Sequence, residues 1–207
     1  VVAGREAIRL TVEDCAFLEP VARQGFGRRH GFLTAGQQIF MQRCYAENAT
    51  FPFVSLERSC GPNVFLDCYA NGEKNQIGPV RYWSTGTLWD NVYGERLLIR
   101  NRGYEGGGWG WSGINQMFWN CTAFEWISVQ SPVSGWNWAI GCEGNRVGAP
   151  FSGLNEFFDN TRANHYPQSL YVQQLADRVG KAKASGVFGD SQISGTVLIQ
   201  LRDTLSR

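Results

Sequence analysis

Short apolar runs of two or three residues recur along this 207-residue chain, and each is followed by one or two polar residues and a Cys. The four clear copies occupy residues 10–16, 39–46, 64–70 and 117–123. Their cysteines are 29, 24 and 53 positions apart, so the last interval spans about two units. We expect a degenerate copy at 97–102 to fill this gap, with Asn101 in place of the Cys. This spacing predicts a solenoid, because each unit buries its apolar face against the next one.

Each unit lacks the apolar period of a helix and consists of short Val-, Ile-, Phe-, Tyr- and Trp-rich runs between turn residues. Coils of this kind predict an all-β fold, a right-handed parallel β-helix. Stacked coils lie about 4.8 Å apart, so equivalent side chains should form ladders. The alternative is a β-sandwich, in which polar and apolar residues alternate along each strand.

The six cysteines could form three disulfides or remain free. We expect free buried thiols, because laddered side chains seldom have the torsion that a disulfide needs. No Cys-x-x-Cys pair is present, so no zinc site is expected. The predicted interior ladder consists of Cys15, Cys44, Cys68 and Cys121, and Cys60 or Cys142 is expected to differ from it.

The repeat pattern fades after residue 144, which divides the chain into three expected parts. Residues 1–144 should hold the coils, residues 145–180 a connection with a short helix, and residues 181–207 a tail. The tail is expected to pack on the solenoid or to extend from it. Its apolar run at 197–199 predicts either docking along the coils or an edge strand.

The short helix is predicted over residues 169–179, where apolar residues fall on one helical face. Ser169 suits the N-cap, and Gly180 stands just past the expected end. We expect this helix to cap an open end of the solenoid, because terminal coils need a cover.

Composition narrows the class of protein without identifying it. Apolar residues make up 43% of the chain and the net charge is +1, so one substantial core is expected and no nucleic-acid partner is indicated. The sequence contains no stretch of about 18 apolar residues, so no membrane span is expected. Abundant Gly and Trp with few Lys indicate a secreted, sugar-facing protein. Either a signal peptide was removed or the sequence begins inside a longer precursor, and the strand-like start favours the precursor.

Several motifs between residues 61 and 141 are similar to those of a known superfamily. They lie at residues 61–68, 78–91, 101–103, 119–121 and 137–141, and residues 167–178 resemble a closing helix. On these motifs the chain resembles the C-terminal portion of secreted right-handed β-helix proteins of the pectate-lyase-like superfamily. The resemblance implies the fold, and it implies a range of activities from polysaccharide lyases and hydrolases to adhesive and structural proteins.

The resemblance also implies a chemistry. Lyase action on a uronate needs a group that neutralises the carboxylate, a base and an acid. In lyases of this superfamily the base is commonly Arg or Lys, and calcium is held by clustered carboxylates. Related sequences often carry two His before the equivalent of Arg81, whereas Val80 stands there in this chain. Because few acids cluster here, we assign no metal ligand and no cofactor, and calcium binding stays open.

The first candidate set is the basic turn formed by Arg28, Arg29 and His30. Adjacent guanidinium groups could grip a uronate or a sulfate, and His30 would titrate near neutral pH. We expect Arg28 and His30 as catalytic candidates and Arg29 as a substrate-binding residue. The alternative is a solvated turn with a structural histidine.

The second candidate set is expected along one face of consecutive coils. Its members are the catalytic candidate Arg81 and the substrate-binding candidates Tyr82, Trp83, Asp90, Arg100 and Arg102. Aromatic faces would stack on sugar rings while guanidinium groups hold carboxylates. The alternative is a structural ladder in which the arginines pair with Asp67, Asp90, Glu95 and Glu105.

A third set consists of tryptophans, two of which lie in the glycine-rich segment 103–113, expected to be a loop. Trp109 and Trp111 are substrate-binding candidates there, because exposed tryptophans indicate a sugar or partner surface. The alternative places such residues in the core, as is common for this residue type.

These observations predict an extracellular β-helix protein that binds an acidic or neutral polysaccharide, with cleavage by β-elimination as a further hypothesis. The alternative is a non-catalytic structural or matrix protein whose coils self-associate through aromatic faces and open ends. Besides a polysaccharide, the expected partners are a second copy or a missing N-terminal portion of the same protein.

Overall fold

The computed structural model describes residues 1–25, 27–72, 76–153, 158–159 and 165–205. Most of its strands belong to three sheets, here called the seven-, six- and four-stranded sheets. The first contains β2 (Thr11–Glu13), β5 (Phe40–Gln42), β8 (Asn63–Leu66), β12 (Thr87–Asp90), β15 (Met117–Trp119), β17 (Trp138–Ile140) and β19 (Phe158–Asp159). The second contains β3 (Ala16–Phe17), β6 (Tyr45–Glu47), β9 (Tyr69–Asn71), β13 (Tyr93–Ile99), β16 (Thr122–Val129) and β18 (Glu143–Arg146). The third contains β1 (Val2–Ala3), β4 (His30–Thr34), β7 (Phe51–Leu56) and β10 (Gly78–Arg81).

All the strand pairs described in these sheets are parallel, and hydrogen-bonded neighbours are never consecutive along the chain. A short two-stranded parallel sheet joins β11 (Ser84–Thr85) to β14 (Gly113–Ile114). Register partners from β2 to β17 lie 21 to 29 residues apart, which matches the repeat length. The predicted parallel pairing is therefore confirmed, and the antiparallel β-sandwich alternative is wrong. The parallel pairing also continues beyond residue 144, because β19 pairs with β17.

The cysteines are free, as predicted, and those of successive repeats occupy equivalent register positions. Cys44, Cys68, Cys121 and Cys142 are buried and Cys60 is exposed, whereas Cys15, expected to be buried, is only half-buried in the first coil. The expected replacement of a ladder Cys by Asn101 is wrong. Tyr93 pairs with both Tyr69 and Thr122, which places Val92 level with Cys68 and Cys121. Val92 therefore occupies the ladder position between Cys68 and Cys121. The copy of the repeat that lacks a Cys includes β12, which is earlier in the chain than the expected residues 97–102.

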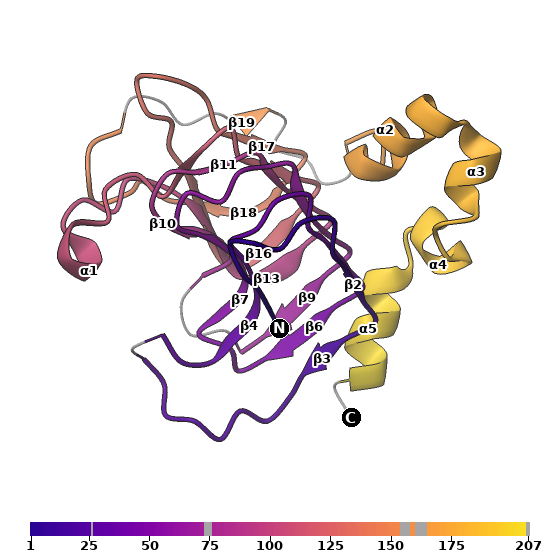
Figure 1. Ribbon diagram of the computed structural model, residues 1–207, viewed down its shortest axis with the longest axis horizontal. Coiled ribbons are helices and arrows are strands. Elements are labelled where there is room, and N and C mark those ends of the chain that lie inside the picture. The colour runs from indigo at the N-terminus through magenta and orange to yellow at the C-terminus, as the bar shows by residue number, and fades with distance from the viewer. Residues whose placement is uncertain (26, 73–75, 154–157, 160–164, 206–207) are drawn as a thin grey trace.

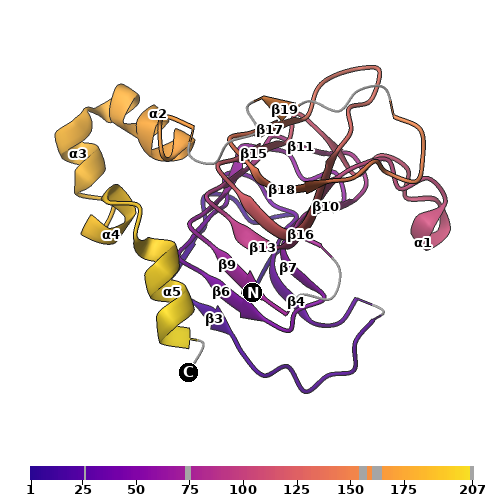
Figure 2. The same ribbon diagram turned by 180° about the vertical axis from the view of Figure 1, so that it is seen from behind.

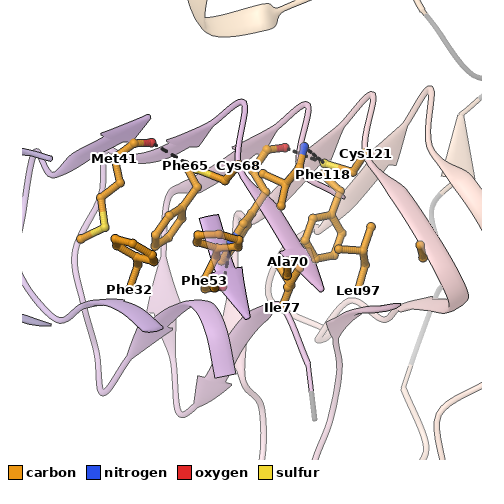
Figure 3. Close-up of a cluster of buried hydrophobic side chains, with 14 of the residues drawn as sticks. Phe32, Met41, Phe53, Phe65, Cys68, Ala70, Ile77, Leu97, Phe118 and Cys121 are labelled. Atoms are coloured by element: carbon orange, nitrogen blue, oxygen red, sulfur yellow. Dashed lines mark hydrogen bonds between the residues drawn. The ribbon is translucent and has the colours of Figure 1, made fainter. Parts of the chain in front are cut away.

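The core lies between the sheets and consists of columns of equivalent side chains (Figure 3). In the seven-stranded sheet, one column contains Met41, Phe65, Trp89 and Phe118, which are register partners in adjacent strands. The ring centroids of Phe65 and Trp89 are 5.8 Å apart, and those of Trp89 and Phe118 are 5.3 Å apart. Complete burial of each such side chain contributes about 1.5–3 kcal/mol, so the columns hold the coils together.

The residue before each position of the cysteine ladder has a left-handed backbone conformation. The φ angles are 54° at Asp14, 50° at Arg43, 51° at Asp67, 52° at Asn91, 48° at Asn120 and 66° at Gly141. Asn, Asp and Gly tolerate this conformation best, which explains the polar residue that precedes most of the cysteines. This single residue turns the chain from the seven-stranded sheet into the six-stranded sheet in every coil.

Four helices follow the coils: α2 (Leu170–Val179), α3 (Lys181–Ser185), α4 (Asp190–Ile193) and α5 (Val197–Leu205). They follow one another along one side of the sheets, away from the short turn α1 (Glu105–Gly108) (Figures 1 and 2). The predicted helix and its N-cap are confirmed, since the Ser169 side chain accepts a hydrogen bond from the Val172 N–H. None of the helices within the described ranges is long and apolar enough to cross a membrane.

The expected capping of an open end by α2 is wrong. Tyr171, Val172 and Leu175 of α2 pack in one cluster with Val64 and Leu66 of the seven-stranded sheet, and the Tyr171 ring contacts Phe40, so the helix covers a side of the coils. The tail also differs from expectation, because residues 181–185 are helical and the run 197–199 belongs to α5 rather than to an edge strand. The tail nevertheless docks along the coils, as one alternative predicted, since α5 contacts β9.

Candidate functional site

A cavity of about 580 Å³ opens on the outward face of the four-stranded sheet. Its polar residues come from sequence-distant segments that the coils bring to one level. We call this cavity the arginine cleft, and its charged or titratable residues are Arg5, Arg29, His30, Glu57 and Arg81. Its apolar walls are formed by Val2, Leu33, Ala35 and Leu56.

Glu57 joins two of the three arginines in the arginine cleft. One carboxylate oxygen is 2.6 Å from Arg5 and the other is 2.6 Å from Arg81. The Glu57 N–H also donates to the Arg81 carbonyl oxygen at 2.6 Å, which holds the two turns together. The Arg5 and Arg81 side chains are 65% and 39% exposed, so much of each guanidinium group stays open to solvent. Exposed ion pairs are weak, and a competing anion can therefore displace Glu57 at little cost.

His30 lies at the start of β4 and forms an inner part of the arginine cleft. Its ring meets the Phe51 ring edge-on at a centroid distance of 5.1 Å. Burial, and secondly the positive charge of Arg81, lower the pKa of His30 below its usual value. The imidazole is therefore neutral at pH 7. Its Nε2 atom is buried and has no hydrogen-bond partner among the described residues.

The first predicted set is divided by the fold. Arg29 and His30 line the arginine cleft together with Arg81, which belongs to the second set. The Arg29 backbone is left-handed, and its guanidinium donates a hydrogen bond to the Ala22 carbonyl oxygen. Arg28 is exposed and does not line the cleft. With neutral histidine, three arginines and one glutamate give this site a net positive charge that attracts anions.

The second set does not form the expected row. Asp90 lies in β12 of the seven-stranded sheet, where it is fully buried beneath α2. One of its carboxylate oxygens accepts hydrogen bonds from the Ser169 hydroxyl and the Tyr171 N–H, both at 2.7 Å. The expectation that Asp90 binds substrate beside Arg81 is therefore wrong, because the two side chains belong to different sheets.

Arg100 and Arg102 are paired with an acidic residue, as the alternative of a structural ladder predicted. Both form ion pairs with Glu105, at 3.2 and 2.8 Å. Arg102 is buried, donates to Gln76 and stacks on the Trp109 ring at 4.7 Å from its centroid. Burial lowers the pKa of Arg102 to about 10, so the group stays charged at pH 7. These contacts position the glycine-rich loop rather than leaving the two guanidinium groups open for a ligand.

The aromatic candidates differ in their exposure. Trp83 is the most exposed of them, at 41%, and Tyr82 carries the Arg58 guanidinium 5.2 Å above its ring centroid. Trp109 packs on the apolar outward residues of the four-stranded sheet. Trp111 is half-buried, and its backbone forms an isolated antiparallel β-bridge with Asn101. Trp83 therefore remains an accessible candidate for contact with a ligand, whereas one face of the Tyr82 ring is covered by Arg58.

Sequence reasoning missed Arg5 and Glu57. Glu57 lies 24 residues before Arg81, which is also the spacing of Cys44 and Cys68, so the repeat length contained a signal for this pair. No comparable spacing indicated Arg5, because the first coil is longer than the coil that separates Glu57 from Arg81. The structure brings these residues to Arg81 through the pairing of β10 with β7 and the position of β1 beside β4.

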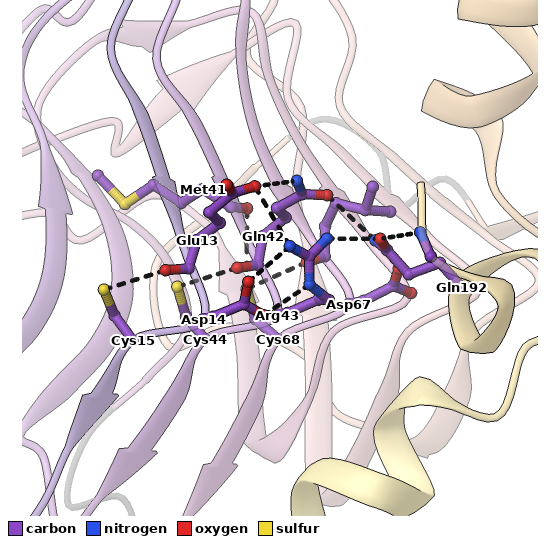
Figure 4. Close-up of polar contacts among 12 residues, drawn as sticks. Glu13, Asp14, Cys15, Met41, Gln42, Arg43, Cys44, Asp67, Cys68 and Gln192 are labelled. Carbon is purple, nitrogen blue, oxygen red and sulfur yellow. Dashed lines mark hydrogen bonds and ion pairs between the residues drawn. The ribbon is translucent and has the colours of Figure 1, made fainter. Parts of the chain in front are cut away.

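A second group of polar side chains lies between the coils and α4 (Figure 4). The Gln192 amide donates to Asp67 at 2.8 Å and to Gln42 at 3.1 Å, and its oxygen accepts from Arg43 at 2.6 Å. Burial raises the pKa of Asp67 to about 6, although its hydrogen bonds from Gln192 and Asn91 oppose this shift. This group tethers α4 to the coils. Within the described ranges, no three His, Cys, Asp or Glu side chains gather where they could hold a metal ion.

Comparisons with family models, curated proteins and solved structures find no match to this chain.

Proposed function

We propose that the chain is a secreted right-handed parallel β-helix that binds an acidic polysaccharide in the arginine cleft. The fold proposal is supported by the strand order, because the first four coils each add one strand to each of the three sheets in the same sequence, and the later coils continue the seven- and six-stranded sheets. Parallel crossovers are right-handed in about 98% of cases, which supports the hand. The pectate-lyase-like resemblance points in the same direction.

The observation that carries the binding proposal is the pairing of Arg5 and Arg81 with a single carboxylate, Glu57, in a cavity that Arg29 also lines. Guanidinium groups bind carboxylates and sulfates through paired, charge-assisted hydrogen bonds. Glu57 occupies the position that a uronate carboxylate would take, and such a carboxylate could replace it on the exposed guanidinium groups. Trp83, which is 41% exposed and two residues from Arg81, would provide an aromatic face for a neighbouring sugar ring.

The geometry favours binding over cleavage. A lyase needs a base that reaches the proton next to the uronate carboxylate. His30 is neutral, as a base must be, but its Nε2 atom is enclosed, and Arg28 does not line the cleft. We therefore propose binding of the acidic polysaccharide as the main function. β-Elimination would be an additional activity, which unsaturated product from the same polysaccharide would reveal.

The test compares binding of polygalacturonate by the unaltered chain, by Arg81→Gln and by Arg96→Gln. Arg96 is a matched control, because it forms a similar 2.6 Å ion pair with Glu125 on the six-stranded sheet. An ion pair at a partly exposed guanidinium group contributes up to about 1 kcal/mol, so we expect Arg81→Gln to weaken binding by up to about fivefold. Arg96→Gln should bind as the unaltered chain does, and added salt should weaken binding in both.

Equal binding by the two variants, or equal binding of polygalacturonate and neutral dextran, would contradict the proposal. Unsaturated product formed by the unaltered chain and lost in His30→Gln would add elimination to the activity.

A second candidate function is self-association of the coils as a structural material. It is favoured by the first coil, where β1, β2 and β3 each form the edge of a sheet within the described residues and Val2 and Ile8 are exposed. Unpaired strand edges are templates for pairing with another chain. Sedimentation at increasing protein concentration distinguishes the two candidates, because a monomer at all concentrations excludes assembly through these edges.

A further inference from the structure

A second cavity, of about 600 Å³, lies between α2 and the outward face of the seven-stranded sheet. It is separate from the arginine cleft and unrelated to the function proposed there. Its floor is a column of apolar side chains, one from each of five successive strands. These residues are Phe40, Val64, Leu88, Met117 and Trp138, and they are register partners.

The floor is continuous, and all of its side chains except the buried Val64 are accessible. Adjacent strands are about 4.8 Å apart, so five side chains extend along the coils as a long, narrow stripe. Phe40, Leu88, Met117 and Trp138 are all partly exposed. An apolar stripe that remains open in the folded protein indicates a binding surface, and the cavity volume falls in the range of small-molecule sites.

Helix α2 builds one wall of the cavity. Tyr171 packs against the floor, with the centroid of its ring 4.7 Å from the centroid of the Phe40 ring. The start of α2 is fixed by the hydrogen bonds of Ser169 and Tyr171 to buried Asp90. The wall is therefore held in place by a buried contact, and the cavity is a built feature of the fold. We call it the α2 groove.

The polar lining of the α2 groove includes a single cation. Gln174 and Arg178 belong to α2, Asn63 and Thr87 begin strands β8 and β12, and Gln38 and Asn115 come from turns. The Arg178 guanidinium forms no ion pair with any described carboxylate, and its side chain belongs to an exposed residue. One cation beside an otherwise apolar stripe is complementary to a ligand with one anionic end and a long apolar body.

We propose that the α2 groove binds a monomeric long-chain fatty acid, with its alkyl chain along the apolar column and its carboxylate at Arg178. A sugar polymer fits this surface poorly. Its hydroxyl groups would lie over Val64, Leu88 and Met117 without hydrogen-bond partners, which is costly. The cavity volume of about 600 Å³ is that of a small-molecule site, which favours a single chain over a flat bilayer.

The test measures displacement of dansyl-labelled undecanoate from the full chain by saturated fatty acids of increasing length, each kept below its micelle-forming concentration. Each buried methylene strengthens apolar binding roughly fourfold, so affinity should rise steeply with chain length until the groove is filled. Dodecanol should bind more weakly than dodecanoate, because it lacks the charge that Arg178 recognises.

Three variants localise the ligand. Leu88→Gln should weaken dodecanoate binding at least tenfold, and Met117→Gln provides the same test if the first variant does not fold. Arg178→Gln should weaken binding of dodecanoate but leave dodecanol unchanged. Arg96→Gln, on the six-stranded sheet, should bind both ligands as the unaltered chain does.

The proposal is overturned if affinity does not depend on chain length, or if the floor variants fold and bind normally. Association of the unaltered chain with phosphatidylcholine vesicles but not with monomeric dodecanoate would also overturn it, and would identify a membrane surface instead. None of these outcomes depends on polygalacturonate binding, so this proposal and the arginine cleft can fail separately.

Discussion

Asp90 is the residue whose chemistry most clearly depends on its surroundings. Its carboxyl group is fully buried, and the oxygen that does not bind Ser169 and Tyr171 has no partner among the described residues. Burial raises the pKa of Asp90 to about 8, and nearby Asp67 adds to the shift. At pH 7 the group is therefore largely protonated. A neutral carboxyl is consistent with an enclosed site that offers no cation.

This shift predicts a pH-dependent stability. The pKa of Asp90 rises from 3.8 in the unfolded chain to about 8 in the folded chain, so folding takes up a proton between these values. The stabilisation is complete below pH 3.8 and is lost as the pH rises to about 8, at no more than about 1.4 kcal/mol per pH unit. Urea unfolding at pH 5, 6, 7, 8 and 9 should therefore show stability that falls up to about pH 8 and then levels off.

The control for this prediction is Asp90→Asn, which keeps an oxygen for Ser169 and Tyr171 but cannot ionise. Its stability should change less with pH than that of the unaltered chain. Asp67 contributes in the same direction up to about pH 6, so the comparison is cleanest between pH 6 and 8. Identical pH dependence in both proteins would show that Asp90 does not titrate in this range.

At the scale of elements, the C-terminal helices are held by few polar contacts at defined points. Ser169 caps α2 and also binds Asp90, which couples the start of the helix to the seven-stranded sheet. Gln192 performs a similar role for α4 through Asp67 and Arg43. The helices therefore depend on the coils for their position, and the α2 groove depends on both.

Ser169→Ala tests this coupling. It removes the N-cap of α2 and leaves Asp90 with one donor fewer, so we expect a loss of about 1–2 kcal/mol in the free energy of unfolding. Backbone amides of α2 should also exchange with solvent faster than those of the coils. Ser185→Ala is the control, because Ser185 is exposed and bonds only to the Ala182 carbonyl oxygen. If α2 amides keep their protection in Ser169→Ala, the cap does not hold the helix.

At the scale of the whole molecule, stability comes from columns that run through all the coils. Trp89 lies in the middle of one column, between Phe65 and Phe118, and its indole N–H donates to the Phe53 carbonyl oxygen at 3.2 Å. It thus joins the seven-stranded sheet to the four-stranded sheet. A gap at this position would interrupt the contact between neighbouring coils.

Trp89→Ala should therefore destabilise the protein by about 3–5 kcal/mol. Trp136→Ala, at a side chain that is half exposed, should cost less than about 1 kcal/mol. Denaturant unfolding followed by circular dichroism compares the two. Similar losses for both variants would mean that the central column does not dominate the stability of the stack.

The sequence alone determined the periodic part of this protein. The Cys repeat predicted parallel strands, a cysteine ladder and polar turn residues, because a stacked unit needs the same small apolar residue and the same turn at each level. Ser169 and Gly180 likewise predicted the bounds of α2, since capping depends on neighbouring residues. These are local requirements that a single chain segment expresses directly.

Only the tertiary structure decided which chemical groups meet. Arg29, His30 and Arg81 were assigned to two different sets, and Asp90 was expected beside Arg81 rather than beneath α2. Coil lengths from 21 to 29 residues shift the outward positions from one level to the next, so spacing along the chain does not fix distance in space. Register and sheet membership set those distances, and they arise from contacts between coils that no single repeat contains.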